Sequence, residues 1–157
     1  MNLNRTTGDS DSISTFEVIV DPAFMRQSHR SVTGRIHVAL GDFPFPARDW
    51  NDFVVVVLGW WLESVLSIRR NGTRAVQCLF VDGPYSFSIQ PDGQQWSVTL
   101  IRNETVINTR NVEPSAVVAS LCAATDLVVA TCTDAEWSSD DLEKLISLRL
   151  KLRRLNN

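Results

Sequence analysis

The longest apolar stretch of the chain restricts its fold more than any other feature. Residues 53–70 read FVVVVLGWWLESVLSIRR, and among the first ten of these positions Gly59 alone is not apolar. Four valines favour a strand, but eighteen residues without a turn signal suit a helix, and the spacing of Val54, Trp61 and Ile68 is helical. We therefore predict a helix that is apolar nearly all round in its first half and covered on more than one side.

Short alternating segments flank this stretch and indicate an antiparallel sheet. The alternation covers residues 15–20 and 35–40 before the helix, and 74–81, 85–90, 95–102 and 105–112 after it. Asp21 and Pro22 are expected to end the first strand, Asn51 or Asp52 to cap the long helix, and Asn71 and Gly72 to end it. Two C-terminal helices are predicted, the first opening at Pro114 and the second running from Asp140 to about Leu155. The expected fold class is α+β in the order ββαββββαα, with one antiparallel sheet of about six strands packed against the long helix and both C-terminal helices completing the cover.

The domain organisation and compartment follow from the N-terminus and the apolar runs. Residues 1–13 lack apolar periodicity and are expected to form a disordered leader, and 14–157 to form a single α+β domain. No cationic start precedes an apolar stretch, and the longest apolar run is shorter than the roughly 20 residues of a membrane span. We therefore expect a cytoplasmic protein without a membrane partner, with Cys78, Cys122 and Cys132 reduced and buried.

Composition and motifs argue against catalysis and against nucleic acid as a partner. The chain has 15 Lys and Arg against 18 Asp and Glu, a net charge of −3, so it lacks a general attraction to polyanions. It has no G-x-S-x-G, no glycine-rich phosphate loop and only two histidines, of which His37 is expected on the exposed face of a strand. Cys122 and Cys132 are too far apart along one helix to hold one metal ion. No enzyme activity, metal or cofactor is predicted.

An acidic segment before the last helix is the first candidate binding site. Its members are Asp134, Glu136, Trp137, Asp140 and Asp141. Helix capping and the helix dipole explain Asp140 and Asp141, together with the capping Ser138, but do not explain Glu136 or Trp137. We expect the segment to bind a partner, with Asp134 steering the encounter. Replacing Glu136 and Trp137 by alanine is expected to weaken binding about thirtyfold and to leave the fold intact.

An aromatic set offers an alternative site of a different class. Trp60, Trp61, Tyr85 and Trp96 are candidates for lining an apolar pocket that binds a small molecule in a regulatory domain. Adjacent helical positions point about 100° apart, so we expect one of Trp60 and Trp61 in the core and the other near the surface. Glu63, the one carboxylate in the apolar helix, is expected on its solvent stripe, with a partner-facing role as the alternative.

The leucines of the last predicted helix admit two interpretations. Leu145, Leu148, Leu152 and Leu155 follow a 3-4-3 spacing that covers two heptads. A coiled coil needs three or four heptads, so an amphipathic helix lying on the domain is favoured over a homodimer seam.

One resemblance adds a functional expectation. The stretch FPFPARDWNDFVVVVLGWWLESV, followed by LFVDGPYSFSIQPDG and WSVTL, resembles small arginine-rich bacterial proteins. Related small α+β proteins include immunity proteins that neutralise toxins from neighbouring cells, among them toxins of contact-dependent growth inhibition. The resemblance covers roughly residues 35–137, rests on structural residues and assigns no binding residue. It implies a cytosolic, non-enzymatic protein that binds a cognate protein toxin; many such toxins are basic nucleases, which an acidic surface captures quickly.

Overall fold

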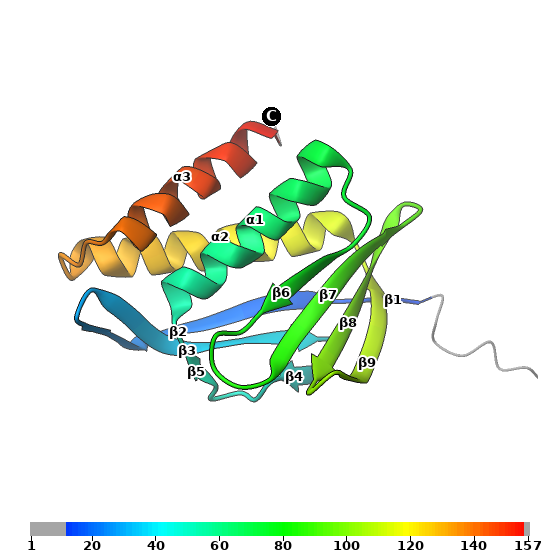
Figure 1. The fold of residues 1–157 in the computed structure, drawn as a ribbon, viewed down its shortest axis with the longest axis horizontal. Coiled ribbons are helices and arrows are strands. Elements are labelled where there is room, and N and C mark those ends of the chain that lie inside the picture. Colours follow the sequence, from blue (N-terminus) through cyan, green and yellow to red (C-terminus); the bar gives the residue numbers. More distant parts are fainter. Residues whose placement is uncertain (1–11, 156–157) are drawn as a thin grey trace, which may run out of the picture.

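The computed structural model describes residues 12–155 and shows an α+β fold with its helices together on one side of the strands (Figure 1). The elements in chain order are β1 (Ile13–Ser14), β2 (Phe16–Ser28), β3 (Ser31–Leu40), β4 (Phe43–Phe45), β5 (Asn51–Asp52), α1 (Val54–Asn71), β6 (Val76–Leu79), β7 (Tyr85–Asp92), β8 (Gln95–Arg102), β9 (Thr105–Val112), α2 (Pro114–Asp134) and α3 (Asp140–Leu155). The α+β class and the three predicted helices are confirmed for this part of the chain.

The strands form two sheets in the described chain, so the expected single six-stranded sheet is wrong. One sheet has five strands in the order β1-β9-β8-β7-β6 and is antiparallel except for the β1–β9 pair. The other sheet has four strands, in which β3 pairs with β2, β4 and β5. Alternation predicts that a segment is a strand but does not choose its partner, and β2 and β3 pair with each other without joining the five-stranded sheet.

The first hairpin is longer than the alternation predicts. Asp21 and Pro22 were expected to end the first strand, but pairing with β3 resumes at Arg26 after a register shift and continues to Ser28. The Asp21 carboxylate accepts the N–H of Ala23 at 3.0 Å, so this turn chemistry makes a local irregularity rather than an end. At the N-terminal side, Ile13 belongs to β1, which shortens the expected leader; residues 1–11 lie outside the described range.

Helix α1 is covered on several sides, as its composition predicts. It packs against β3, β6, α2 and α3, and ten of its residues are buried. Gly72, with φ of 62°, ends the helix by donating its N–H to the Ile68 carbonyl, the expected left-handed exit. The expected side-chain cap is absent from its first turn, because Phe53 occupies the N-cap position and Asp52 forms other hydrogen bonds.

An aromatic cluster joins the two sheets beneath α1. Phe16 of β2 lies with its ring centroid 5.8 Å from that of Phe87 on β7, and Phe45 of β4 lies 5.7 Å from Tyr85. Trp61 contacts Phe80 and Phe87 at 5.1 and 5.0 Å. The helix and both sheets therefore share one core in the described residues.

Helices α2 and α3 complete the cover. The long α2 packs against β2, α1 and α3. Its length and apolar composition would also suffice for a membrane crossing, a property that core helices of proteins outside membranes share. The spacing of α3 is that of an amphipathic helix: Leu145, Leu148 and Leu152 are buried, whereas Leu155 is exposed. The three buried leucines pack inside the chain, as expected of an amphipathic helix lying on the domain.

Candidate functional site

The structure brings the acidic segment to one end of the molecule, where α2 ends and α3 begins. Asp134, Glu136, Asp140 and Asp141 are all exposed, and Trp137 between them is half-buried. Glu143, one turn into α3, adds a further exposed carboxylate. We call Asp134, Glu136, Asp140 and Asp141 together the acidic end.

The turn at the acidic end fixes Glu136 in an unusual backbone conformation. Helix α2 closes with the Trp137 N–H donating to the Cys132 carbonyl at 2.9 Å, and Glu136 between them has φ of 59°. This position in a helix-ending motif is usually glycine, and a side chain there costs about 1 kcal/mol. The backbone therefore does not favour a glutamate at this place, as is also true of Glu104, with φ of 65°, in the turn between β8 and β9.

Two expectations about this segment are corrected. Ser139, not Ser138, caps α3, because its Oγ accepts the N–H of Leu142 at 3.1 Å. Trp137 packs against the hydrophobic core, so its replacement by alanine would remove core contacts as well as any partner contact. Substitutions of Glu136 and its exposed acidic neighbours therefore test binding without removing core contacts, whereas a substitution of Trp137 removes both kinds of contact.

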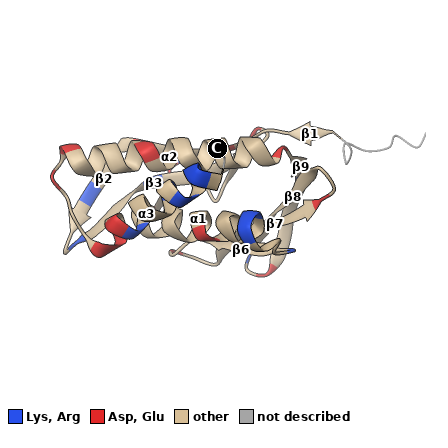
Figure 2. Ribbon diagram, turned by 90° about the horizontal axis from the view of Figure 1, so that it is seen from above, with Lys and Arg blue, Asp and Glu red and all other residues tan. Residues whose placement is uncertain are grey.

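Charge is segregated between the two ends of the helical layer. Two ion pairs, Lys144–Glu63 at 2.9 Å and Arg149–Asp126 at 2.9 Å, are formed within residues 12–155, and neither involves the acidic end. Figure 2 shows acidic segments where α2 meets α3 and basic segments on the C-terminal parts of α1 and α3. None of the four carboxylates of the acidic end forms a salt bridge in the described chain, but Asp141 lies near Lys144 and contributes to the raised pKa of that ammonium.

Glu63 lies on the solvent stripe of α1, as expected, but its partner was not foreseen. Lys144 of α3 reaches it, with both side chains largely exposed. The carboxylate beside Lys144 raises the pKa of that ammonium. The ion pair connects α1 to α3 at the surface, and such exposed ion pairs contribute little to the free energy of folding.

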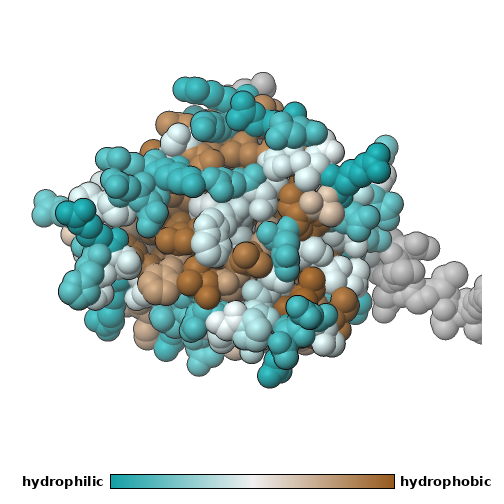
Figure 3. Space-filling model, viewed as in Figure 1, coloured by the Kyte–Doolittle hydropathy of each residue, from teal (hydrophilic) through white to brown (hydrophobic). Residues whose placement is uncertain are grey.

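The aromatic set is dispersed rather than gathered around one cavity. Trp61 is fully buried and donates its indole N–H to the Leu79 carbonyl at 2.8 Å, whereas its neighbour Trp60 is exposed, which confirms the expected division. Trp60 lines a shallow groove of about 470 Å³ with Leu79 and other residues of α1 and β6. On the face that Figure 1 presents, hydrophobic surface alternates with hydrophilic side chains (Figure 3).

Tyr85 belongs to a structural cluster that the sequence did not reveal. Its ring packs edge-on against Trp50, with centroids 4.9 Å apart. The indole N–H of Trp50 donates to Asp52 Oδ2 at 3.0 Å, and the same oxygen accepts the N–H of Asp82 at 3.2 Å. The buried Asp52 also accepts the N–H of Phe53 at 2.7 Å. One carboxylate thus ties the loop before α1 to the turn before β7.

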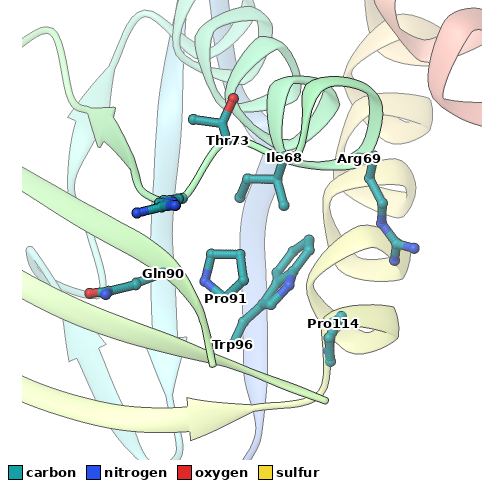
Figure 4. Close-up of a pocket in the computed structure, with 9 residues that line it drawn as sticks. Ile68, Arg69, Thr73, Gln90, Pro91, Trp96 and Pro114 are labelled. Atoms are coloured by element: carbon teal, nitrogen blue, oxygen red, sulfur yellow. The ribbon is translucent and has the colours of Figure 1, made fainter. Parts of the chain in front are cut away.

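Trp96 lines a separate cleft of about 500 Å³. Figure 4 shows it facing Pro91 and Ile68, with Arg69 and Pro114 at its side. The walls come from the end of α1, the β7–β8 hairpin and the first residue of α2, three segments distant in sequence. Of these residues the sequence singled out Trp96 alone; the one further signal was three arginines, Arg69, Arg70 and Arg74, within six positions around Gly72.

The three cysteines and His37 are buried, whereas His29 is exposed. Burial raises the pKa of the Cys78 thiol to about 12 and also raises the pKa values of Cys122 and Cys132, so the nucleophilic thiolates are disfavoured. His37, expected to be exposed, is buried; burial, followed by the nearby charge of Arg48, lowers its pKa. Within residues 12–155 no group of three or more His, Cys, Asp or Glu side chains could hold a metal ion.

Comparison of the chain with protein-family models, curated proteins and solved structures finds no match.

Proposed function

We propose that the chain is a non-enzymatic bacterial immunity protein that binds and neutralises one cognate protein toxin in the cytoplasm. The observation that carries the proposal is Glu136, an acidic side chain held in a left-handed backbone conformation where glycine would be more stable. Strained backbone positions are frequent at functional sites; the described chain has four others outside glycine, at His29, Arg30, Asn103 and Glu104.

The surroundings of Glu136 support binding of a basic partner. Asp134, Asp140 and Asp141 are exposed beside it and form no ion pair in the described structure. Unpaired carboxylates at one end of a molecule attract a cationic surface and accelerate its encounter. A basic nuclease is the class of toxin whose surface best complements this end. No nucleic acid or membrane is part of this proposal.

The function is tested by protection of a growing cell. The toxin domain of a large secreted protein encoded next to this chain is expressed in a sensitive bacterial host, with and without the chain. We expect growth to stop with the toxin alone and to resume when both proteins are produced. The absence of such a neighbouring gene, or growth arrest despite production of both proteins, would contradict the proposal.

A second candidate function, binding of a small molecule, is favoured by one observation. The cleft beside Trp96 has a volume within the range of about 300–1,000 Å³ of small-molecule sites and combines apolar walls with a few polar groups. The pocket expected from Trp60, Trp61, Tyr85 and Trp96 together is replaced here by a cleft that contains only the last of them among its lining residues.

A further inference from the structure

From the cleft beside Trp96 we infer that the chain binds a small organic anion, a carboxylate or phosphate carried on a flat apolar group. The inference deepens the second candidate function and is independent of toxin binding, since the acidic end lies at the other end of α2.

The side chains that line the cleft carry positive charge. Arg69 and Arg74 line it, and no carboxylate is among its lining residues. Neither arginine forms an ion pair within the described chain. Guanidinium groups bind carboxylate and phosphate oxygens through paired hydrogen bonds, so two unpaired arginines in a concave site favour an anionic ligand.

The side chain of Arg69 lies against Trp96. Its guanidinium carbon lies 5.5 Å from the centroid of the Trp96 ring, a cation–π contact that holds the side chain at the cleft. Arg69 also lines a neighbouring cavity of about 370 Å³, together with Arg153 and with Arg149, which is paired with Asp126. Although the chain is acidic overall, this end of the helical layer is therefore basic, and a concave basic surface concentrates anions.

The apolar walls define the rest of the ligand. Ile68 and Trp96 are nearly covered, and Pro91 and Pro114 stand beside them (Figure 4). The Thr73 hydroxyl donates to the Ser67 carbonyl at 3.1 Å, so this polar group is already engaged. An apolar ring lying against Pro91 and the accessible edge of Trp96, with its anionic group toward an arginine, would satisfy both kinds of surface.

Titration calorimetry with four probes tests the inference: benzoate, phenyl phosphate, the neutral benzamide and acetate, which lacks a ring. We expect saturable binding of benzoate, phenyl phosphate or both at one site per chain, about tenfold weaker binding of benzamide and acetate, and weakening by salt. Binding of benzoate alone or of phenyl phosphate alone identifies the anionic group as carboxylate or phosphate.

Variants locate the site. Arg69→Gln and Arg74→Gln should each weaken anion binding about tenfold, whereas Arg110→Gln, a matched loss of an exposed arginine on β9, should not change it. Arg69→Lys, which keeps the charge, should recover part of the loss. Melting curves establish that each variant is folded.

The failures are distinguishable. Equal binding of benzamide and benzoate would overturn the anionic class and leave small-molecule binding standing. Equal binding of acetate and benzoate would overturn the apolar part of the ligand. Binding of no probe, or binding that Arg69→Gln and Arg74→Gln leave unchanged, would overturn both the inference and the second candidate function, with no consequence for toxin binding.

Discussion

Replacing Trp61 by alanine is expected to lower the free energy of unfolding by about 4 kcal/mol, the range for removal of a buried tryptophan. Trp61 is fully buried, contacts the rings of Phe80 and Phe87, and donates its indole N–H to the Leu79 carbonyl. The loss combines a cavity beneath α1 with a missing hydrogen bond. In a chain of this size it should lower the melting temperature by about 8–16 °C.

The neighbouring tryptophan provides a matched control for this experiment. Trp60 is 38% exposed and makes no contact with the aromatic cluster that is comparable to that of Trp61. Trp60→Ala should change the stability by less than about 1 kcal/mol. Chemical denaturation of both variants measures the difference, and equal losses would contradict the assignment of Trp61 to the core.

Replacing Asp52 by alanine is expected to cost about 3 kcal/mol, because three donors lose their acceptor at a buried place. These donors are the indole N–H of Trp50 and the backbone N–H groups of Phe53 and Asp82. Asp52→Asn, which keeps one oxygen acceptor, should lose less. Denaturation gives the free energies, and faster hydrogen exchange of the Asp82 amide in Asp52→Ala would show the loop separating from the turn.

Asp49 is the control for Asp52, since it is an exposed carboxylate on the same loop. Asp49→Ala should alter the stability by no more than about 0.5 kcal/mol. A loss of similar size in Asp49→Ala and Asp52→Ala would show that the loop's charge, rather than these three hydrogen bonds, supports the fold.

Local patterns predicted the elements well because each element is encoded within its own segment. The helix over 53–70 followed from its length and helical spacing, and β8 and β9 followed from alternation between turns. The division into two sheets could not be predicted in this way, because any antiparallel partner satisfies the same alternation. Pro22 similarly suggested a strand end, whereas the irregularity beside it is absorbed by the hairpin.

The candidate sites show the same limit. The acidic end is contiguous in sequence, so its residues were found, although capping moved by one residue to Ser139. The cleft was missed because α1, the β7–β8 hairpin and the start of α2 each contribute only part of it. Asp52 looked like a helix cap because its sequence neighbours are helical, whereas one of its donors comes from Asp82, thirty positions later.

We expect the acidic end to accelerate capture of a basic toxin, and the rate at which the chain associates with the toxin measures this effect directly. The fourfold variant Asp134→Asn, Glu136→Gln, Asp140→Asn and Asp141→Asn is compared with a control in which four exposed carboxylates elsewhere are neutralised, namely Asp42, Asp49, Asp92 and Glu104. Both sets change the net charge from −3 to +1. Any difference in association rate between the two variants therefore reports the position of the neutralised carboxylates rather than the total charge.

Binding to the toxin domain encoded by the neighbouring gene is followed by stopped-flow fluorescence at low and high salt. We expect the fourfold variant to associate at least about tenfold more slowly than the native chain at low salt. This difference in rate should become smaller at high salt. The association rate of the control should stay closer to that of the native chain. Equal association rates for the fourfold variant and the native chain at low salt would contradict the proposed role of the acidic end.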